Sequence, residues 1–272
     1  MKKNKLYLLG KVFIWLMLAV MYLPIVILVI FSFSGSSGIG AWGNFDFTFD
    51  LYAGLFTNEQ IMSAVANTFI IAGVSCLFAT FIGTISAVGI YYLHRPFKNA
   101  MSAVNRITVI NADIVTAVAF MVFFIVCLNY LDGYVALIIA HTMICTPYVI
   151  LSVMPRLGQI NPNLYEAGRD LGAGAFRTLF TIILPQLIPG IISGAVMAFT
   201  LSLDDFVITL FNKGSGLETI STLIYSSTKH GIDPTFRALS TIIFVGILAV
   251  LIGINIYSAS RRKKAKLAGG NV

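Results

Sequence analysis

The chain has 272 residues, of which 58% are hydrophobic and only 11% are charged. Soluble domains have a charged fraction of roughly 25%, so the composition excludes an ordinary soluble enzyme or binding module. The formal net charge is +7, which on a chain this apolar requires an account of where the basic residues lie.

Six continuous apolar segments approach or exceed the roughly 20 residues that a helix needs to cross the hydrocarbon core of a bilayer. They show no period-2 alternation, so we predict helices and not the strands of a barrel. The segments are residues 12–33, 61–93, 107–130, 134–154, 186–211 and 236–260. We therefore predict an all-α integral membrane protein with six transmembrane helices. Residues 1–33 would form an N-terminal tail and a retained anchor helix, and residues 61–260 the transmembrane core.

The basic residues are concentrated in one set of connecting segments. They precede the first span, follow the second, fourth and sixth spans, and end in the "RRKK" tail at 261–272. The other set of connections holds only Lys213, Lys229 and Arg237. The positive-inside rule therefore predicts that both termini are cytoplasmic. The tail is typical of a contact with membrane lipid, which we favour over nucleic-acid binding.

The connection at residues 155–185 is too long and too patterned for a plain loop. Asn163 followed by Glu166 fits a capping box, which predicts a short helix over residues 164–171. Gly172 stands where a helix C-terminus favours glycine. A second amphipathic piece should follow and end at Pro185, with apolar residues at helical spacing: Phe176, Leu179, Phe180 and Ile183. An amphipathic helix lying on the lipid surface is the alternative interpretation.

The stretch "EAGRDLGAGAFRTLFTIILP" resembles the EAA loop of the inner-membrane permease subunits of ABC importers. The residues that match are Glu166, Ala167, Gly172, Ile182, Leu184 and Pro185. Gly168 departs from the pattern, because the family usually has a second alanine there. The stretches "HTMICTPYVILSVMPRL", "AFTLSLDDFVIT" and "TLIYSSTKHGIDPTFRALST" resemble the spermidine/putrescine permeases of this family. In the third span Ala112 replaces the usual proline, so no kink is predicted.

The resemblance implies the transmembrane domain of a type I importer, with a cytoplasmic coupling helix between helices 4 and 5. Glu166, Ala167, Gly168 and Gly172 would contact a dimer of ATP-binding subunits. A second permease subunit and an extracytoplasmic polyamine-binding protein would complete the system. The chain has no G-x-x-x-x-G-K-[ST] phosphate loop. We therefore expect no cofactor here, ATP and Mg being bound by the ATPase partner, and no enzymatic activity.

The fifth apolar segment contains two adjacent acids, Asp204 and Asp205. Each costs about 2.5–3.5 kcal/mol inside a membrane on insertion scales, so they indicate a function. On a continuous helix Asp205 would share a polar stripe with Ser202, Thr209 and Asn212. We expect Asp205, Ser202 and Thr209 to face a substrate path and Asp204 to lie beside it or against the partner. Placement at the outer interface, or pairing with Arg237, is the alternative.

An unpaired carboxylate suits a cationic cargo such as a polyamine. Asp113, expected near the cytoplasmic side, and Tyr225, in an outer loop, are weaker candidates for which ordinary packing is the alternative. His141 is expected to form an interhelix hydrogen bond. Small residues in the fifth span, among them Gly190 and Gly194, suit close helix packing.

Two other functions remain open from the sequence. The same class of importer could carry a different small solute, such as an amino-acid derivative, thiamine or iron. A stand-alone secondary carrier or a membrane enzyme is less favoured. A carrier should show internal repeats, and no clear repeat relates the two halves of the chain.

Overall fold

The computed structural model describes residues 2–35, 46–129, 131–228, 233–249 and 252. The regular elements of this part of the chain are helices, apart from one isolated bridge between Ser34 and Phe47. The chain divides into two compact units. One is Ser63–Ser226, and the other combines Met1–Met62 with Ser227–Val272. The predicted basic tail at 261–272 lies outside the described residues.

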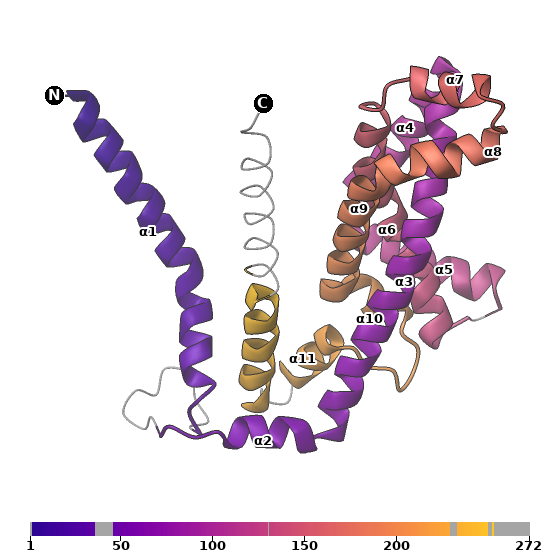
Figure 1. Cartoon of the computed structure of the whole chain (residues 1–272). Coiled ribbons are helices and arrows are strands. Elements are labelled where there is room, and N and C mark those ends of the chain that lie inside the picture. Colours follow the sequence, from indigo (N-terminus) through magenta and orange to yellow (C-terminus); the bar gives the residue numbers. More distant parts are fainter. Residues whose placement is uncertain (1, 36–45, 130, 229–232, 250–251, 253–272) are drawn as a thin grey trace. The chain divides into compact units, whose positions relative to one another are not determined.

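The unit that contains the N-terminus has α1 (Lys2–Phe31), α2 (Asp50–Thr57) and the helix Thr235–Ala249 (Figure 1). An 18-residue apolar window within Gly10–Phe31 has no residue buried inside the chain, as expected of a helix surrounded by lipid, and Phe31 at the end of the stretch is buried. After α1, the ring of Phe33 contacts that of Tyr52 on α2 with centroids 5.2 Å apart. The hydroxyls of Ser32 and Tyr52 are 2.8 Å apart. These contacts connect the end of α1 to α2.

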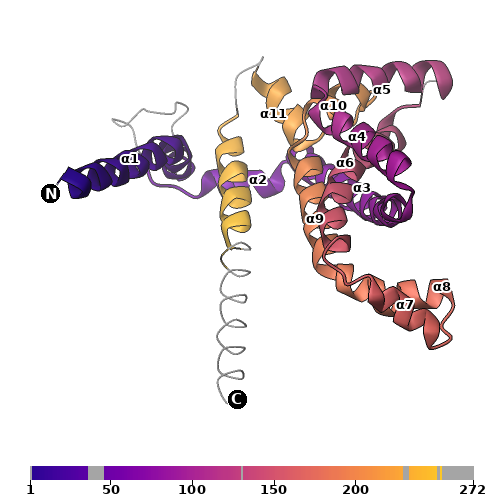
Figure 2. The ribbon, with the colours of Figure 1, turned by 90° about the horizontal axis from the view of Figure 1, so that it is seen from above.

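The core of the unit Ser63–Ser226 is formed by α3 (Glu59–Tyr92), α6 (Gly133–Leu157) and α9 (Leu184–Asp204), with α6 packed along α9 (Figure 2). Glycines allow the close approach. A Cβ atom added to Gly83 on α3 would lie 2.7 Å from Cβ of Val149, and one added to Gly194 would lie 3.1 Å from its Cγ1. The thiols of Cys76 and Cys145 donate to carbonyls of α9. The predicted role of Gly194 in helix packing is confirmed.

The third predicted span, residues 107–130, is wrong as a single helix. The chain forms α4 (Arg95–Ile110) and α5 (Asp113–Cys127), which meet at 102°. Asn111 and Ala112 are extended at the break. The Asn111 side chain donates to Thr116 Oγ1, and the Ala112 carbonyl accepts from the amides of Val115 and Thr116. The first turn of α5 thus has local partners, which allows the bend without proline.

The helix before the fifth span does not end at Pro185 as predicted. The chain is helical from Ala175 to Asp204, through α8 (Ala175–Thr178), a π-helical turn (Leu179–Ile183) and α9. Proline in a regular helix interior removes one hydrogen bond and clashes with a carbonyl of the preceding turn. In the π-helical turn the Leu184 amide donates to the carbonyl of Leu179, five residues earlier, instead of to the carbonyl four residues earlier. The Gln186 side chain donates to the Ile182 carbonyl, so this turn has additional support.

The single fifth helix predicted over residues 186–211 is also wrong, because α9 ends at Asp204. A separate helix, α10 (Val207–Asn212), follows it, and α11 (Ile220–Thr228) comes after a connection. Four helices of the described residues are long and apolar enough to span a membrane, and the pair α4 and α5 can supply a fifth span. The all-α membrane fold is confirmed. The sixth span, predicted to end at 260, extends past the described residues, so the count of six stays a prediction.

We predict that Gly83→Ala destabilises the protein, because the new Cβ would overlap Val149. Overpacking of this kind costs about 1–3 kcal/mol. Gly73→Ala on the same helix is the matched control, since no atom lies within 4 Å of its added Cβ. Thermal unfolding of the full chain in detergent should show a lower midpoint for Gly83→Ala only. Equal midpoints for the two variants would contradict the close packing of α3 on α6.

Candidate functional site

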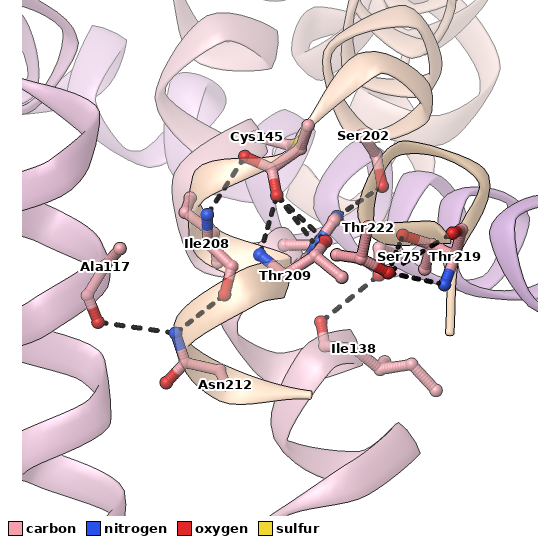
Figure 3. Close-up of polar contacts among 12 residues, drawn as sticks. Ser75, Ala117, Ile138, Cys145, Ser202, Ile208, Thr209, Asn212, Thr219 and Thr222 are labelled. Atoms are coloured by element: carbon pink, nitrogen blue, oxygen red, sulfur yellow. Dashed lines mark hydrogen bonds and ion pairs between the residues drawn. The ribbon is translucent and has the colours of Figure 1, made fainter. Parts of the chain in front are cut away.

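A buried histidine joins three helical segments beside the acid pair. His141 lies on α6 and is 1% exposed. Its Nδ1 is 2.7 Å from Oγ of Ser202 on α9, and its Nε2 is 3.1 Å from Oγ1 of Thr209 on α10. The interhelix hydrogen bond expected of His141 is therefore confirmed. Figure 3 shows Ser202 and Thr209 reaching this region from different helical segments.

Asp205 lies in the break between α9 and α10 and holds the start of α10. Its backbone is extended, with φ −63° and ψ 128°. One carboxylate oxygen accepts from the amide and the hydroxyl of Thr209, each at 2.9 Å, and the other lies 3.4 Å from the amide nitrogen of Ile208. Phe206 is the N-cap residue of α10, so Asp205 caps the first turn from the position before it, by accepting amides that have no partner within the helix. Two backbone donors of the first turn of α10, the amides of Ile208 and Thr209, therefore have a side-chain partner.

The proton arrangement of this group follows from its donors. The Thr209 hydroxyl donates to Asp205, so its oxygen can accept from His141 Nε2–H, and Nδ1 then accepts from Ser202. A neutral imidazole satisfies all of these atoms. Asp205 Oδ2 is 3.5 Å from His141 Nε2. Asp205 is therefore not the unpaired carboxylate that the sequence indicates, because His141, remote from it in sequence, lies beside it.

The other two acids near this group are exposed. Asp204 ends α9 and Asp113 begins α5, and the two carboxylates are within electrostatic range of each other and of the Asp205 region. The sequence places Asp113 near the cytoplasmic side. The structure brings Asp113 within electrostatic range of Asp204, directly after the bend between α4 and α5, and its side of the membrane stays a prediction. Tyr225 on α11 also approaches, with its ring 4.8 Å from that of Phe206.

A polar connection supports the segment after α10. The Asn212 side chain donates to the carbonyl of Ala117 on α5 and to that of Ile208 (Figure 3). In the connection between α10 and α11, Lys213 forms an ion pair with Glu218. Asn67 of α3 donates to the Glu218 carbonyl at 2.8 Å. These contacts fix α10, and with it Thr209, against α3 and α5.

The predicted helix in the connection 155–185 is present as α7 (Asn163–Asp170). The capping box of Asn163 with Glu166 is wrong, since α7 has no side-chain cap of that kind. The Asn161 side chain accepts from the Asn163 amide instead. Gly172 ends the helix as predicted. Its φ is +80°, its amide donates to the Arg169 carbonyl, and the amide of Ala173 donates to the Gly168 carbonyl, which is the Schellman motif.

Gly168 is the inward-facing residue of α7. A Cβ atom there would lie 2.8 Å from Cγ2 of Thr178 and 2.8 Å from Cδ1 of Ile182. The glycine that departs from the family pattern therefore lets α7 lie directly on α8 and the π-helical turn. From the sequence this glycine is only a departure from the family pattern, and the packing reason depends on the distant residues Thr178 and Ile182.

The opposite face of α7 and its surroundings is exposed. Glu166 and Ala167 lie on this face. Large apolar side chains beside them also point away from the chain, with Leu171 89% exposed, Phe176 79% and Phe180 61%. An exposed group of large apolar residues around a polar one indicates a binding surface.

The pattern of one protein family matches the larger part of the chain. The family is described as "Binding-protein-dependent transport system inner membrane component", and residues 79–264 match it. The matched range contains α7, His141 and the acid pair.

Two named relatives match nearly the whole chain. One is the "Spermidine/putrescine transport system permease protein PotC" of Shigella flexneri. It is 35% identical over 255 residues, which cover 93% of this chain and 94% of the relative. The other is the "Putrescine transport system permease protein PotI" of Escherichia coli (strain K12). It is 32% identical over 254 residues, covering 91% and 89%.

A solved structure has the same fold. It is the crystal structure of a bacterial ABC transporter involved in the import of the acidic polysaccharide alginate. The TM-score is 0.69 at 14% identity, and the match covers 95% of this chain and 98% of that chain. At this identity the likeness shows the fold alone.

We predict that Asp205→Ala and Asp205→Asn differ in stability. Asparagine keeps an oxygen that can cap α10, whereas alanine removes it and should cost about 0.5–2 kcal/mol. Thermal unfolding of the full chain in detergent should give a lower midpoint for alanine, with Asp204→Ala as the exposed neighbouring control. If both Asp205 variants lose the same stability, the charge and not the cap holds the break.

Proposed function

This chain belongs to the family of inner-membrane components of binding-protein-dependent transport systems, and we propose that it carries a polyamine through an ABC importer. It is a multi-pass permease subunit and not an enzyme. The proposal of spermidine or putrescine as cargo is supported by the names of relatives at 32–35% identity. It also draws on the acids of this chain.

The observation that carries the cargo proposal is the gathering of Asp113, Asp204 and Asp205 at two helix breaks. A polyamine is a chain of ammonium groups joined by methylenes, so it needs carboxylates for the charges and aromatic walls for the stem. Asp204 and Asp113 are exposed, and the ring of Phe206, two residues after Asp204, pairs with that of Tyr225. Because the Asp205 carboxylate already caps α10, we assign the first contact with cargo to Asp204. Ser202 and Thr209 then support the substrate path indirectly, by their hydrogen bonds to His141.

The fold by itself does not specify the cargo. The solved transporter with a TM-score of 0.69 imports an acidic polysaccharide, whereas three neighbouring carboxylates would repel an anion. The side chains at this site, and not the fold, therefore determine whether the cargo is a cation or an anion. A different small solute, such as an amino-acid derivative, thiamine or iron, is the outcome that uptake assays would reveal if polyamines are not carried.

We further propose that α7 is the coupling helix and contacts an ATP-binding subunit. Glu166 and Ala167 on the exposed face, together with the apolar side chains of Leu171 and Phe176, would form the contact. Gly168 would transmit it to α8, and Gly172 would shape the end of the helix. The ATP-binding dimer would bind ATP and Mg. A second permease subunit and an extracytoplasmic polyamine-binding protein would complete the importer.

The orientation follows from this assignment. Because α7 must meet the ATPase, the end of the unit that carries α7 would be cytoplasmic, in a bacterial cytoplasmic membrane. The positive-inside rule separately assigns both termini to the cytoplasmic side. The basic tail would then lie on anionic lipid.

The cargo proposal predicts that Asp204→Asn weakens polyamine uptake. Loss of one charged contact to an ammonium group should raise KM for spermidine or putrescine roughly 10- to 100-fold. Uptake of labelled polyamines by a deletion strain carrying the variant measures this. Asp50→Asn in the first turn of α2 is the control. Unchanged KM in Asp204→Asn would remove this acid from the path, and normal uptake of a neutral solute in place of polyamines would overturn the cargo.

The coupling proposal predicts that Gly172→Asp and Glu166→Ala lower uptake without preventing membrane insertion. A non-glycine residue at φ +80° is strained by about 1–2 kcal/mol, which would distort the end of α7. Gly174→Asp is the matched control, because its φ of −62° accepts a side chain and its added Cβ meets no atom within 4 Å. ATP hydrolysis that continues in the assembled transporter without uptake would indicate uncoupling. Normal uptake in both test variants would refute a coupling role for α7.

A further inference from the structure

A cavity that the transport function does not use lies between α4 and the last turns of α3 and α6. Its volume is about 460 Å³. One face of α4 supplies Lys98, Asn99, Ser102 and Arg106, and the last turns of α3 and α6 supply Tyr91 and Met154 among others. The cavity is therefore polar and cationic on one side and partly apolar on the other.

The two cations of this cavity have no carboxylate partner. The ion pair of the described residues is Lys213 with Glu218, and Asp205 lies beside the neutral His141; neither contact involves α4. Lys98 Nζ instead donates to the Tyr91 carbonyl at 3.3 Å and lies 4.1 Å above the centre of the Tyr91 ring. These neutral contacts hold the ammonium group in place and leave its charge uncompensated. An anion would complete the group.

The outer face of α4 is apolar and exposed. Phe97, Met101, Val104 and Ile107 follow one another at helical spacing, with 64%, 48%, 58% and 67% of their surfaces exposed. A basic face and an exposed apolar face on one helix are typical of a helix that lies at the boundary of headgroups and acyl chains. A water-soluble anion would have no use for the apolar face.

The cavity also lies at the depth where headgroups are expected. The spanning helices α3 and α6 end at Tyr92 and Leu157, and their last turns line the cavity. Tyrosines are enriched at the membrane–water interface, and Tyr91 and Tyr92 end α3. Basic pockets between spanning helices bind anionic headgroups.

We propose that this cavity binds the phosphate of an anionic phospholipid. Lys98 and Arg106 neutralise the phosphate, Ser102 and Asn99 donate hydrogen bonds to the headgroup, and the acyl chains lie along Phe97, Met101 and Val104. The site is separate from both the acid group at Asp205 and the exposed face of α7.

The test is lipid binding to the full chain purified in neutral detergent. Phosphatidylglycerol and phosphatidylcholine are titrated separately, and bound lipid is measured by native mass spectrometry. Phosphatidylglycerol should bind more tightly. In Lys98→Gln/Arg106→Gln its affinity should fall about 25-fold, which corresponds to about 1 kcal/mol for each cation. Arg95→Gln/Arg177→Gln removes the same charge outside the cavity and should leave the affinity unchanged.

Two further measurements separate the possible anions and protect the test against misfolding. Met101→Ser/Val104→Ser should weaken phosphatidylglycerol binding, because the acyl chains lose their apolar contact. Inorganic phosphate is then added as a competitor. If it competes equally well in this variant and in the parent, the cavity is a site for free phosphate. Arg106→Gln alone, at an exposed position, replaces the double variant if the latter unfolds. Equal binding of both lipids, or equal loss in the control, would overturn the proposal and assign the cavity to a protein partner.

Discussion

The structure depends on one requirement of the bilayer, that every backbone donor and acceptor within it has a partner. Two predicted spans are interrupted, and local groups supply partners at each interruption: a side chain before α10, and the Ala112 carbonyl together with a side-chain contact before α5. Asp205 accepts from the first amides of α10, and Asn111 contacts Thr116 at the start of α5. Because helix breaks in a membrane require polar side chains, the acids of this chain, Asp113, Asp204 and Asp205, lie at the two breaks.

The same requirement gives Asp205 two tasks. Its carboxylate holds α10 in place and, through Thr209, fixes the orientation of His141, so it is part of the structure before any cargo arrives. Asp204, one residue earlier, is exposed and carries no such task in the break. An acid that is already occupied holds its neighbours rigid, whereas an exposed one is available to a passing cation. Two adjacent residues of the same type can therefore have different roles, one in holding the structure and the other in contact with a ligand.

The sequence predicts those features that depend on local chemistry. Long apolar runs locate α1, α3 and α6, and glycine at 172 predicts the end of α7. Features that depend on distant partners could not be predicted. The run after Asp205 is as apolar as a continuing helix, so nothing local marks the break. His141 is remote in sequence from Asp205, and the reason for glycine at 168 is the side chain of Thr178. The break at Asn111 contains neither proline nor glycine, the usual signals.

The π-helical turn has a mechanical consequence. Because it lets the chain pass Pro185 without a break, the helical stretch Ala175–Asp204 forms a single arm between α7 and the acid pair. At 1.5 Å per residue the arm is about 45 Å long, so each degree of tilt at its α7 end displaces the far end by about 0.8 Å. Gly168 lets α7 pack against the first residues of this arm, and Asp205 follows its last residue, at the break before α10. A small rotation of α7 that moved this stretch as a rigid body would therefore be amplified at the acids.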